Sequence, residues 1–179
     1  MFIKRLLFSV FEFLLSVGMA GLVVYWTYRV QIWSNKDFDE EDELKKDNLA
    51  VSILLSANML ASGLIIQKGL KPILSLLRIY MTTPIGQNLN QWQISFFALA
   101  QFVMVFMLAA LTIYFSLRMF GKLTRHMHPG QELKKGNVSI GVLLASVVLV
   151  MALYISDGIS SLSRAMLPQP SIGRVEILE

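Results

Sequence analysis

Four long apolar stretches limit what this chain can fold into more than any other feature. They run over about residues 6–28, 48–67, 93–117 and 137–156. A helix needs about 20 apolar residues to cross the ~30 Å hydrocarbon core of a bilayer, and each stretch is long enough. Backbone groups inside lipid must be satisfied internally, so such stretches cross as helices. The sequence therefore predicts an all-α fold, an integral membrane four-helix bundle.

Composition supports a membrane location. Hydrophobic residues make up 55% of the 179 residues and charged residues only 16%, whereas soluble domains are about a quarter charged. The net charge is +4, but the basic residues flank the apolar stretches, so we expect them to bind the bilayer surface and not nucleic acid. The first stretch ends in the bulky letters YWTYR without a small-residue cleavage site, so we expect a permanent helix and not a signal peptide.

A thirteen-residue segment occurs in two similar copies, ELKKDNLAVSILL at 43–55 and ELKKGNVSIGVLL at 132–144. At this offset of 89 residues, 43–69 matches 132–158 at eleven of 27 positions. The offset also pairs Tyr25 with Tyr114 and Arg29 with Arg118 in the preceding stretches. A constant offset across a helix, a loop and a second helix indicates a duplicated unit, and a unit of two spans predicts parallel repeats.

The predicted organisation follows from this offset. A first hairpin repeat covers 1–81, a linker 82–92, a second hairpin repeat 93–168 and a C-terminal tail 169–179. The mixed stretches 70–81 and 159–168, which follow the second and fourth apolar stretches, are expected to lie along the membrane surface.

The doubled pattern E-L-K-K-x-N, followed by an aliphatic run and a closing glycine in a four-span chain, resembles the YjfL-type bacterial membrane family, also called domain of unknown function 350. The resemblance covers about 6–165, with Gly69 and Gly158 as the closing glycines. The second copy departs from the pattern because LLASVVLVMAL lacks a mid-helix glycine. The resemblance implies an inner-membrane protein of unsettled activity, often encoded among envelope-stress components, and it brings no catalytic residues.

The repeated motif has a structural and a functional interpretation. Asn48 and Asn137 stand where the second and fourth helices are expected to begin, and asparagine is a favoured N-cap residue. Glu43 and Glu132 lie five residues earlier, where the positive end of a helix dipole favours a carboxylate. Helix capping explains both residue types, and contact with an ion or a lipid headgroup is the alternative.

A set of polar residues within the apolar stretches forms a candidate polar path. Its members are Glu12, Asn48, Ser52, Ser56, Asn58, Ser62 and Gln101. Small and polar residues also pack helices together, which is the structural alternative for the serines. A carboxylate such as Glu12 at membrane depth is costly and marks a functional site, unless it reaches the interface beside Lys4 and Arg5.

Other site chemistry is poorly supported. Lys68 and Asp157 occupy matching repeat positions and are expected to form a salt bridge. His126 and His128 are only two metal ligands, which favours a solvated loop over a metal site. The chain has no cysteine and shows no pairing of a nucleophile with a base. We expect no cofactor, no metal and no enzymatic activity.

Two functions remain, both in a multi-pass protein of the bacterial inner membrane. The polar path of an expected homo-oligomer favours passage of an ion or small solute. The alternative is a membrane scaffold in an envelope-stress or defence system, which recruits a soluble protein through its charged loops. Lysine and arginine number nine on the side of these loops and seven on the other, which favours cytoplasmic loops with both termini outside.

Overall fold

The computed structural model describes residues 2–34, 39–82, 91–123 and 128–166. These residues form six helices and no strand. Four helices are long: α1 (Phe2–Ser34), α3 (Leu49–Thr82), α4 (Gln91–Leu123) and α6 (Val138–Met166). Two are short and lie within the charged connectors, α2 (Glu40–Lys45) and α5 (Pro129–Lys134). The all-α prediction is confirmed.

Each long helix contains a segment that is long and apolar enough to cross a bilayer. The segments are Ser9–Ile32, Leu49–Ser75, Ser95–Met119 and Val138–Met166. Large apolar side chains such as Leu14 on α1 and Leu60 on α3 are more than 60% exposed, as lipid-facing residues are. The chain is a polytopic helical membrane protein.

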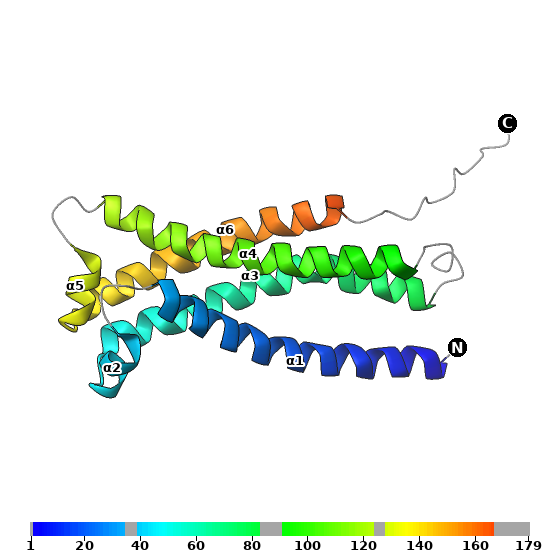
Figure 1. Ribbon diagram of the computed structural model, residues 1–179, viewed down its shortest axis with the longest axis horizontal. Coiled ribbons are helices and arrows are strands. Elements are labelled where there is room, and N and C mark those ends of the chain that lie inside the picture. The colour runs from blue at the N-terminus through cyan, green and yellow to red at the C-terminus, as the bar shows by residue number, and fades with distance from the viewer. Residues whose placement is uncertain (1, 35–38, 83–90, 124–127, 167–179) are drawn as a thin grey trace.

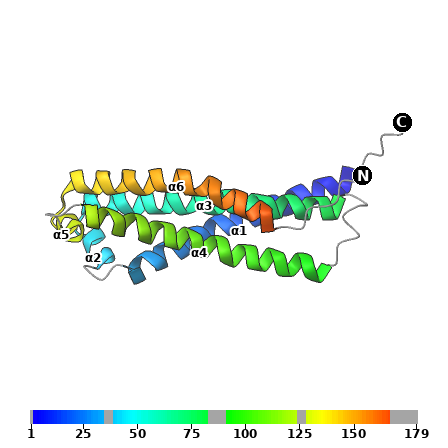
Figure 2. The same ribbon diagram turned by 90° about the horizontal axis from the view of Figure 1, so that it is seen from above.

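The long helices run in alternating directions along one axis (Figure 1). α3 and α6 start at the end that carries α2 and α5, and α1 and α4 start at the opposite end (Figure 2). Both short helices therefore lie at the same end of the bundle, which we call the α2/α5 end.

Helix boundaries in the two halves correspond at the offset read from the sequence. α1 and α4 begin 89 residues apart, as do α2 and α5, and α3 and α6. The correspondence fits duplication of a two-span unit, although the arrangement as two parallel repeats stays a prediction.

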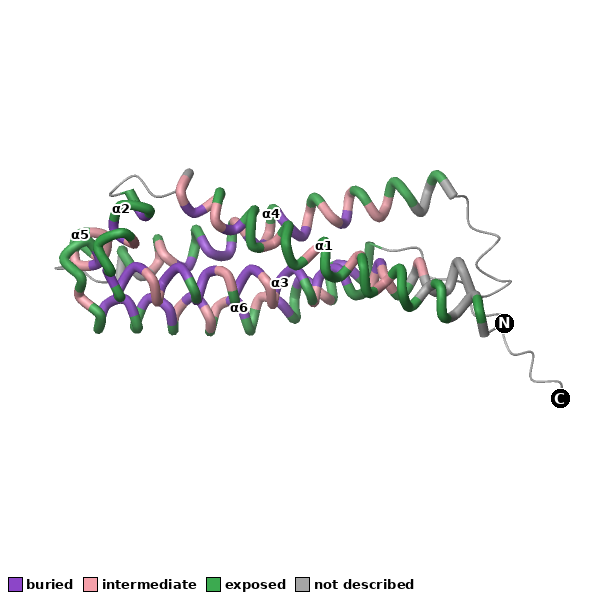
Figure 3. The backbone as a smooth tube through the Cα atoms, turned by 90° about the horizontal axis from the view of Figure 1, so that it is seen from below, coloured by how far each residue is buried: buried purple, intermediate pink, exposed green. Residues whose placement is uncertain are grey.

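The centre of the bundle is the pair α3 and α6. α3 is the most enclosed span, with 56% of its most apolar window buried, whereas α1 is the least enclosed, with 11% (Figure 3). A Cβ atom added at Gly141 would lie 2.7 Å from the Ala50 carbonyl oxygen, so the two backbones almost touch there. The missing side chain at Gly141 allows this approach.

The helices extend further than the apolar stretches. α3 continues through 70–81, including Pro72, and α6 continues to Met166, so the expectation that 70–81 and 159–168 lie on the membrane surface is wrong where these segments are described. The reason is continued burial, because Leu70 and Ile73 on α3 and Ile159 on α6 keep facing the core. Most of the predicted linker and the whole tail 169–179 lie outside the described residues.

Candidate functional site

The first copy of the repeated motif forms a compact turn between α2 and α3. Backbone N–H groups of Asp47 and Asn48 donate to the carbonyls of Leu44 and Glu43, both at 3.1 Å. These two bonds form a Schellman motif, which ends α2 with Asp47 in the left-handed region at φ 56°. Asn48 is therefore the last residue of one turn and the N-cap of the next helix.

The Asn48 side chain uses all of its hydrogen-bonding capacity. Its Oδ1 accepts from the backbone N–H groups of Ala50 at 3.1 Å and Val51 at 3.3 Å, which caps α3. Its Nδ2 donates to Glu43 Oε2 and to the carbonyl oxygen of Leu133 on α5, both at 2.9 Å. Asn48 thus joins the turn of the first half to the short helix of the second half.

The second copy builds the same turn around Asn137. Its Nδ2 donates to Glu132 Oε2 at 3.1 Å, and its Oδ1 accepts from the Ile140 N–H at 3.4 Å. Gly136 holds the left-handed position at φ 78°. This copy is more open, because the Glu132 side chain is 26% exposed and that of Glu43 is 6% exposed.

Both glutamates are held ionised by their partners. The hydrogen bond from Asn48, together with Lys46 at 2.9 Å, lowers the pKa of Glu43. Lys135 at 2.7 Å, with help from Asn137, lowers the pKa of Glu132. The same pairing with Glu43 raises the pKa of Lys46. These contacts explain the motif structurally, because each copy stabilises the turn between a short helix and the long helix that follows it.

The candidate polar path divides in the structure. Asn58, Ser62 and Gln101 are at most 3% exposed and lie inside the bundle. Gln101 on α4 donates to the Gly69 carbonyl on α3 at 2.9 Å. Ser52 and Ser56 are half-buried and exposed, respectively, and their hydroxyls donate to carbonyls one turn earlier in α3.

Glu12 lies apart from the other members of the path. It is half-buried on the N-terminal half of α1, which diverges from the other helices in Figure 1. Lys68 and Asp157 form an ion pair at 2.5 Å between α3 and α6. The Asp157 side chain is 75% exposed and that of Lys68 is 34% exposed, so the pair lies at the surface of the bundle.

Several buried polar atoms have no hydrogen-bond partner within the described part of the chain. They include both amide atoms of Asn58, Gln101 Oε1, Thr27 Oγ1 and Gln31 Oε1. A buried polar group without a partner costs about 1–3 kcal/mol, and membrane-embedded polar groups are by default functional candidates. These side chains therefore mark the interior positions where a polar solute or ligand would be stabilised.

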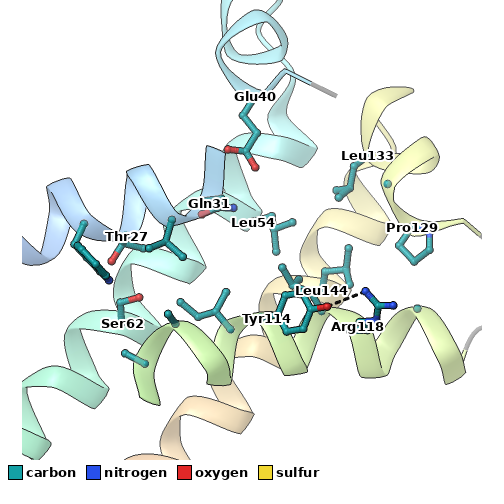
Figure 4. A pocket seen from close by; sticks show the side chains of 18 residues that line it. Thr27, Gln31, Glu40, Leu54, Ser62, Tyr114, Arg118, Pro129, Leu133 and Leu144 are labelled. Atoms are coloured by element: carbon teal, nitrogen blue, oxygen red, sulfur yellow. Dashed lines mark hydrogen bonds between the residues drawn. The ribbon is translucent and has the colours of Figure 1, made fainter. Parts of the chain in front are cut away.

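A cavity of about 440 Å³ lies between α1 and α4 at the α2/α5 end (Figure 4). Thr27 and Gln31 line it from α1, Glu40 from α2 and Ser62 from α3. The opposite wall carries Tyr114 and Arg118 of α4, with Arg118 Nη1 donating to the Tyr114 hydroxyl at 2.8 Å. The cavity brings together polar side chains from four helices.

Most of the residues that line this cavity could not be predicted from the sequence. Thr27 and Gln31 are four residues apart on one helix face, and that spacing was the available signal. Glu40 offered none, because it is one of five consecutive acidic residues at 39–43, and only the fold shows that it is 3% exposed.

The described residues contain no group of three histidine, aspartate or glutamate side chains placed to hold a metal ion. His128 precedes α5 as its N-cap residue without a side-chain capping bond, and His126 lies outside the described residues.

Comparison with known proteins gives the family but no activity. No curated protein and no solved structure matches the chain. One family, described as Domain of Unknown Function (DUF350), matches residues 5–159, which is most of the chain. The DUF350 membership predicted from the repeated motif is therefore confirmed, and the chain belongs to the DUF350 family.

Proposed function

We propose that this protein forms a non-enzymatic passage for an ion or small solute, with the cavity as its vestibule. The observation that carries the proposal is the depth of the cavity. It extends from Glu40 and Pro129, outside the spans, to Ser62, the central residue of the span Leu49–Ser75. A polar solute can thus reach the middle of the bilayer along Gln31, Thr27 and Ser62.

Polar side chains lie beside the cavity and beyond its end. Asn58 lies one turn before Ser62 on α3, between the cavity-lining Leu54 and Ser62, and Gln101 lies eight residues from the cavity-lining Ala109 on α4, about 12 Å along the helix. Between them the bundle is filled by buried Ile65, Ile66 and Val105. In the proposed mechanism these apolar side chains are the gate, and Asn58 and Gln101 are the polar positions on either side of it.

The proposal extends to assembly and location. The exposed side chain of Ser56 on α3, one turn from the half-buried Ser52, favours contact with a second copy, because small polar residues support close helix packing in lipid. We place the homo-oligomer in a bacterial inner membrane with the α2/α5 end in the cytoplasm and both termini outside. The weak excess of lysine and arginine near the charged connectors supports that orientation.

Single cysteines test the vestibule cleanly, because the chain has no cysteine of its own. Thr27→Cys and Ser62→Cys should react with a membrane-impermeant thiol reagent applied at the α2/α5 end. Leu60→Cys, at a lipid-facing position that is 62% exposed on the same helix, should stay protected. Equal protection of Ser62→Cys and Leu60→Cys would contradict the vestibule.

Flux through the protein is measured in reconstituted liposomes. Val105→Ala trims the proposed gate and should raise the flux of the transported ion or solute, whereas Val103→Ala, at a 49% exposed position on α4, should not. If Ser62→Cys reacts with the reagent but the protein carries no flux in a panel of ions and small solutes, the passage is refuted. The cavity would then be a binding site only.

A scaffold remains the second candidate, and the surface of α2 supports it. Within the acidic segment 37–43, Glu40 and Glu43 are buried, whereas Glu41 and Asp42 face outward. Asp37 lies outside the described residues. In this alternative the outward carboxylates recruit a basic soluble protein, and Glu41→Gln with Asp42→Asn should reduce its co-purification from native membranes. Unchanged co-purification would count against the scaffold.

A further inference from the structure

One wall of the cavity, formed by α1 and α2, carries Thr27, Gln31 and Glu40 (Figure 4). Thr27 is 3% exposed and Gln31 is 8% exposed, and neither Thr27 Oγ1 nor Gln31 Oε1 has a hydrogen-bond partner within the described residues. The two side chains lie one helical turn apart and therefore on the same face of α1. The Glu40 carboxyl group, on a residue only 3% exposed, lines the same cavity from α2. This wall therefore has the features of a binding site, because the buried polar side chains of Thr27 and Gln31 line the cavity.

The oxygen atoms on this wall favour a ligand group that is positively charged and donates hydrogen bonds. A carboxylate and an amide oxygen only accept hydrogen bonds, and a threonine hydroxyl accepts as readily as it donates. A primary ammonium has three N–H donors, which match the three oxygen groups of Glu40, Gln31 and Thr27. The ring of Trp26 on α1 also lines the cavity and favours a cation near its face.

The opposite wall carries the complementary charge. Arg118 lines the cavity from α4, and its guanidinium lies 5.7 Å from the centre of the Tyr114 ring. Arginine is the side chain best suited to bind a phosphate, because its planar donors match two phosphate oxygens. A ligand that spans the cavity would thus carry an ammonium at one end and a phosphate at the other.

We propose that this cavity binds a phosphoethanolamine group, with the ammonium at Glu40, Gln31 and Thr27 and the phosphate toward Arg118. Thr27 and Gln31 belong to the last turns of the span Ser9–Ile32, and Glu40 lies just outside it, so the cavity mouth is at headgroup depth. Two sources supply this chemistry, the headgroup of phosphatidylethanolamine and free phosphoethanolamine. The proposal concerns binding alone and applies to a passage and to a scaffold equally.

The lipid source is tested with the full chain in nanodiscs of equal parts phosphatidylethanolamine and phosphatidylcholine. Native mass spectrometry after release counts the lipids that stay bound. Choline has no N–H donor, so we expect phosphatidylethanolamine to be retained about tenfold more, the ratio for one charge-assisted hydrogen bond. Glu40→Gln and the double variant Thr27→Val with Gln31→Leu should abolish this preference.

The control keeps the test specific to the cavity. Thr112→Val removes a hydroxyl that is buried on α4 and already donates to the Leu108 carbonyl at 2.7 Å, and it should keep the wild-type preference. Thr27→Val conserves shape and removes an unpartnered oxygen, and Gln31→Leu replaces an amide whose Oε1 has no partner with an apolar side chain, so the double variant should melt close to wild type. Loss of binding in a variant that melts normally then reflects the lost oxygens.

The soluble source is tested in phosphatidylcholine nanodiscs, with the thermal shift produced by free phosphoethanolamine compared with that produced by phosphocholine. A shift with phosphoethanolamine alone, lost in the double variant, assigns the site to the free compound. Lipid retention without that shift assigns it to the headgroup. Equal retention of both lipids together with equal shifts from both compounds would overturn the proposal, as would a double variant that keeps the wild-type preference.

Discussion

Asn48 donates its side-chain amide to the backbone carbonyl of Leu133, 85 residues later in the chain, at 2.9 Å. The bond is buried, and the same amide group also holds Glu43. One side chain thus caps α3, closes the turn from α2 and fastens α5 of the other half. Asn137 caps its own helix but is half-buried, so the two copies of one motif carry unequal structural weight.

This inequality predicts different costs for the same substitution. Asn48→Ala should lower the free energy of unfolding by about 2–4 kcal/mol, because it removes the cap and leaves the Leu133 carbonyl without this donor. Asn137→Ala should cost about 1 kcal/mol, the usual value of an N-cap. Denaturant unfolding in detergent micelles measures both. Equal losses would show that the bond between the halves adds nothing.

The contact between α3 and α6 predicts a strong effect of one methyl group. Gly141→Ala places a Cβ 2.7 Å from the Ala50 carbonyl oxygen, and backbone atoms cannot move aside as a side chain can. The loss should be about 1–3 kcal/mol, as for overpacking in other cores. The matched control on the same helix is Gly158→Ala, whose Cβ would meet nothing within 4 Å. Thermal unfolding of both variants should show a lower melting temperature for Gly141→Ala only.

The lowered pKa of Glu43 predicts that its contacts with Asn48 and Lys46 weaken in acid. A carboxyl group whose pKa is lower in the folded state stabilises the fold at neutral pH, and that contribution is lost as the pH falls through the lowered pKa. The free energy of unfolding should therefore decrease on acidification, as the pH falls from the ordinary glutamate pKa through the lowered pKa of Glu43. Glu43→Gln should be less stable at pH 7 and lose less on acidification, because it has no proton to take up there.

The acid test has its own control within the repeat. Glu132→Gln removes the more exposed carboxylate of the second copy and should leave most of the acid dependence in place. The measurement is denaturant unfolding from neutral to acidic pH for wild type and both variants. Identical pH profiles for wild type and Glu43→Gln would assign the acid dependence to other groups.

The left-handed position of the second turn predicts a need for glycine there. Gly136 has φ 78°, which an L-residue adopts at a cost of about 1 kcal/mol. Gly136→Ala should therefore destabilise the protein by about that amount. Gly63→Ala, inside α3 with nothing within 4 Å of its Cβ, should instead stabilise it by up to about 1 kcal/mol through helix propensity. The opposite order of melting temperatures would contradict the turn geometry.

The four spans and the 89-residue correspondence between helix boundaries could be predicted from the sequence, because both are one-dimensional patterns. Apolar length decides whether a helix crosses a bilayer, and a shared offset survives whatever the helices pack against. The positions of Asn48 and Asn137 at helix starts also follow from local chemistry, since a cap bonds only to the next few residues.

Tertiary structure alone decided how the polar residues are used. Ser56 and Ser62 are alike in sequence, yet one is exposed and the other is 3% exposed beside the cavity, because helix rotation is set by packing at contacts such as that between Gly141 and Ala50. The same holds for the wall of Thr27, Gln31 and Glu40, which two helices form together. Residues distant in the chain meet only when burial brings their helices together, and no local pattern encodes that meeting.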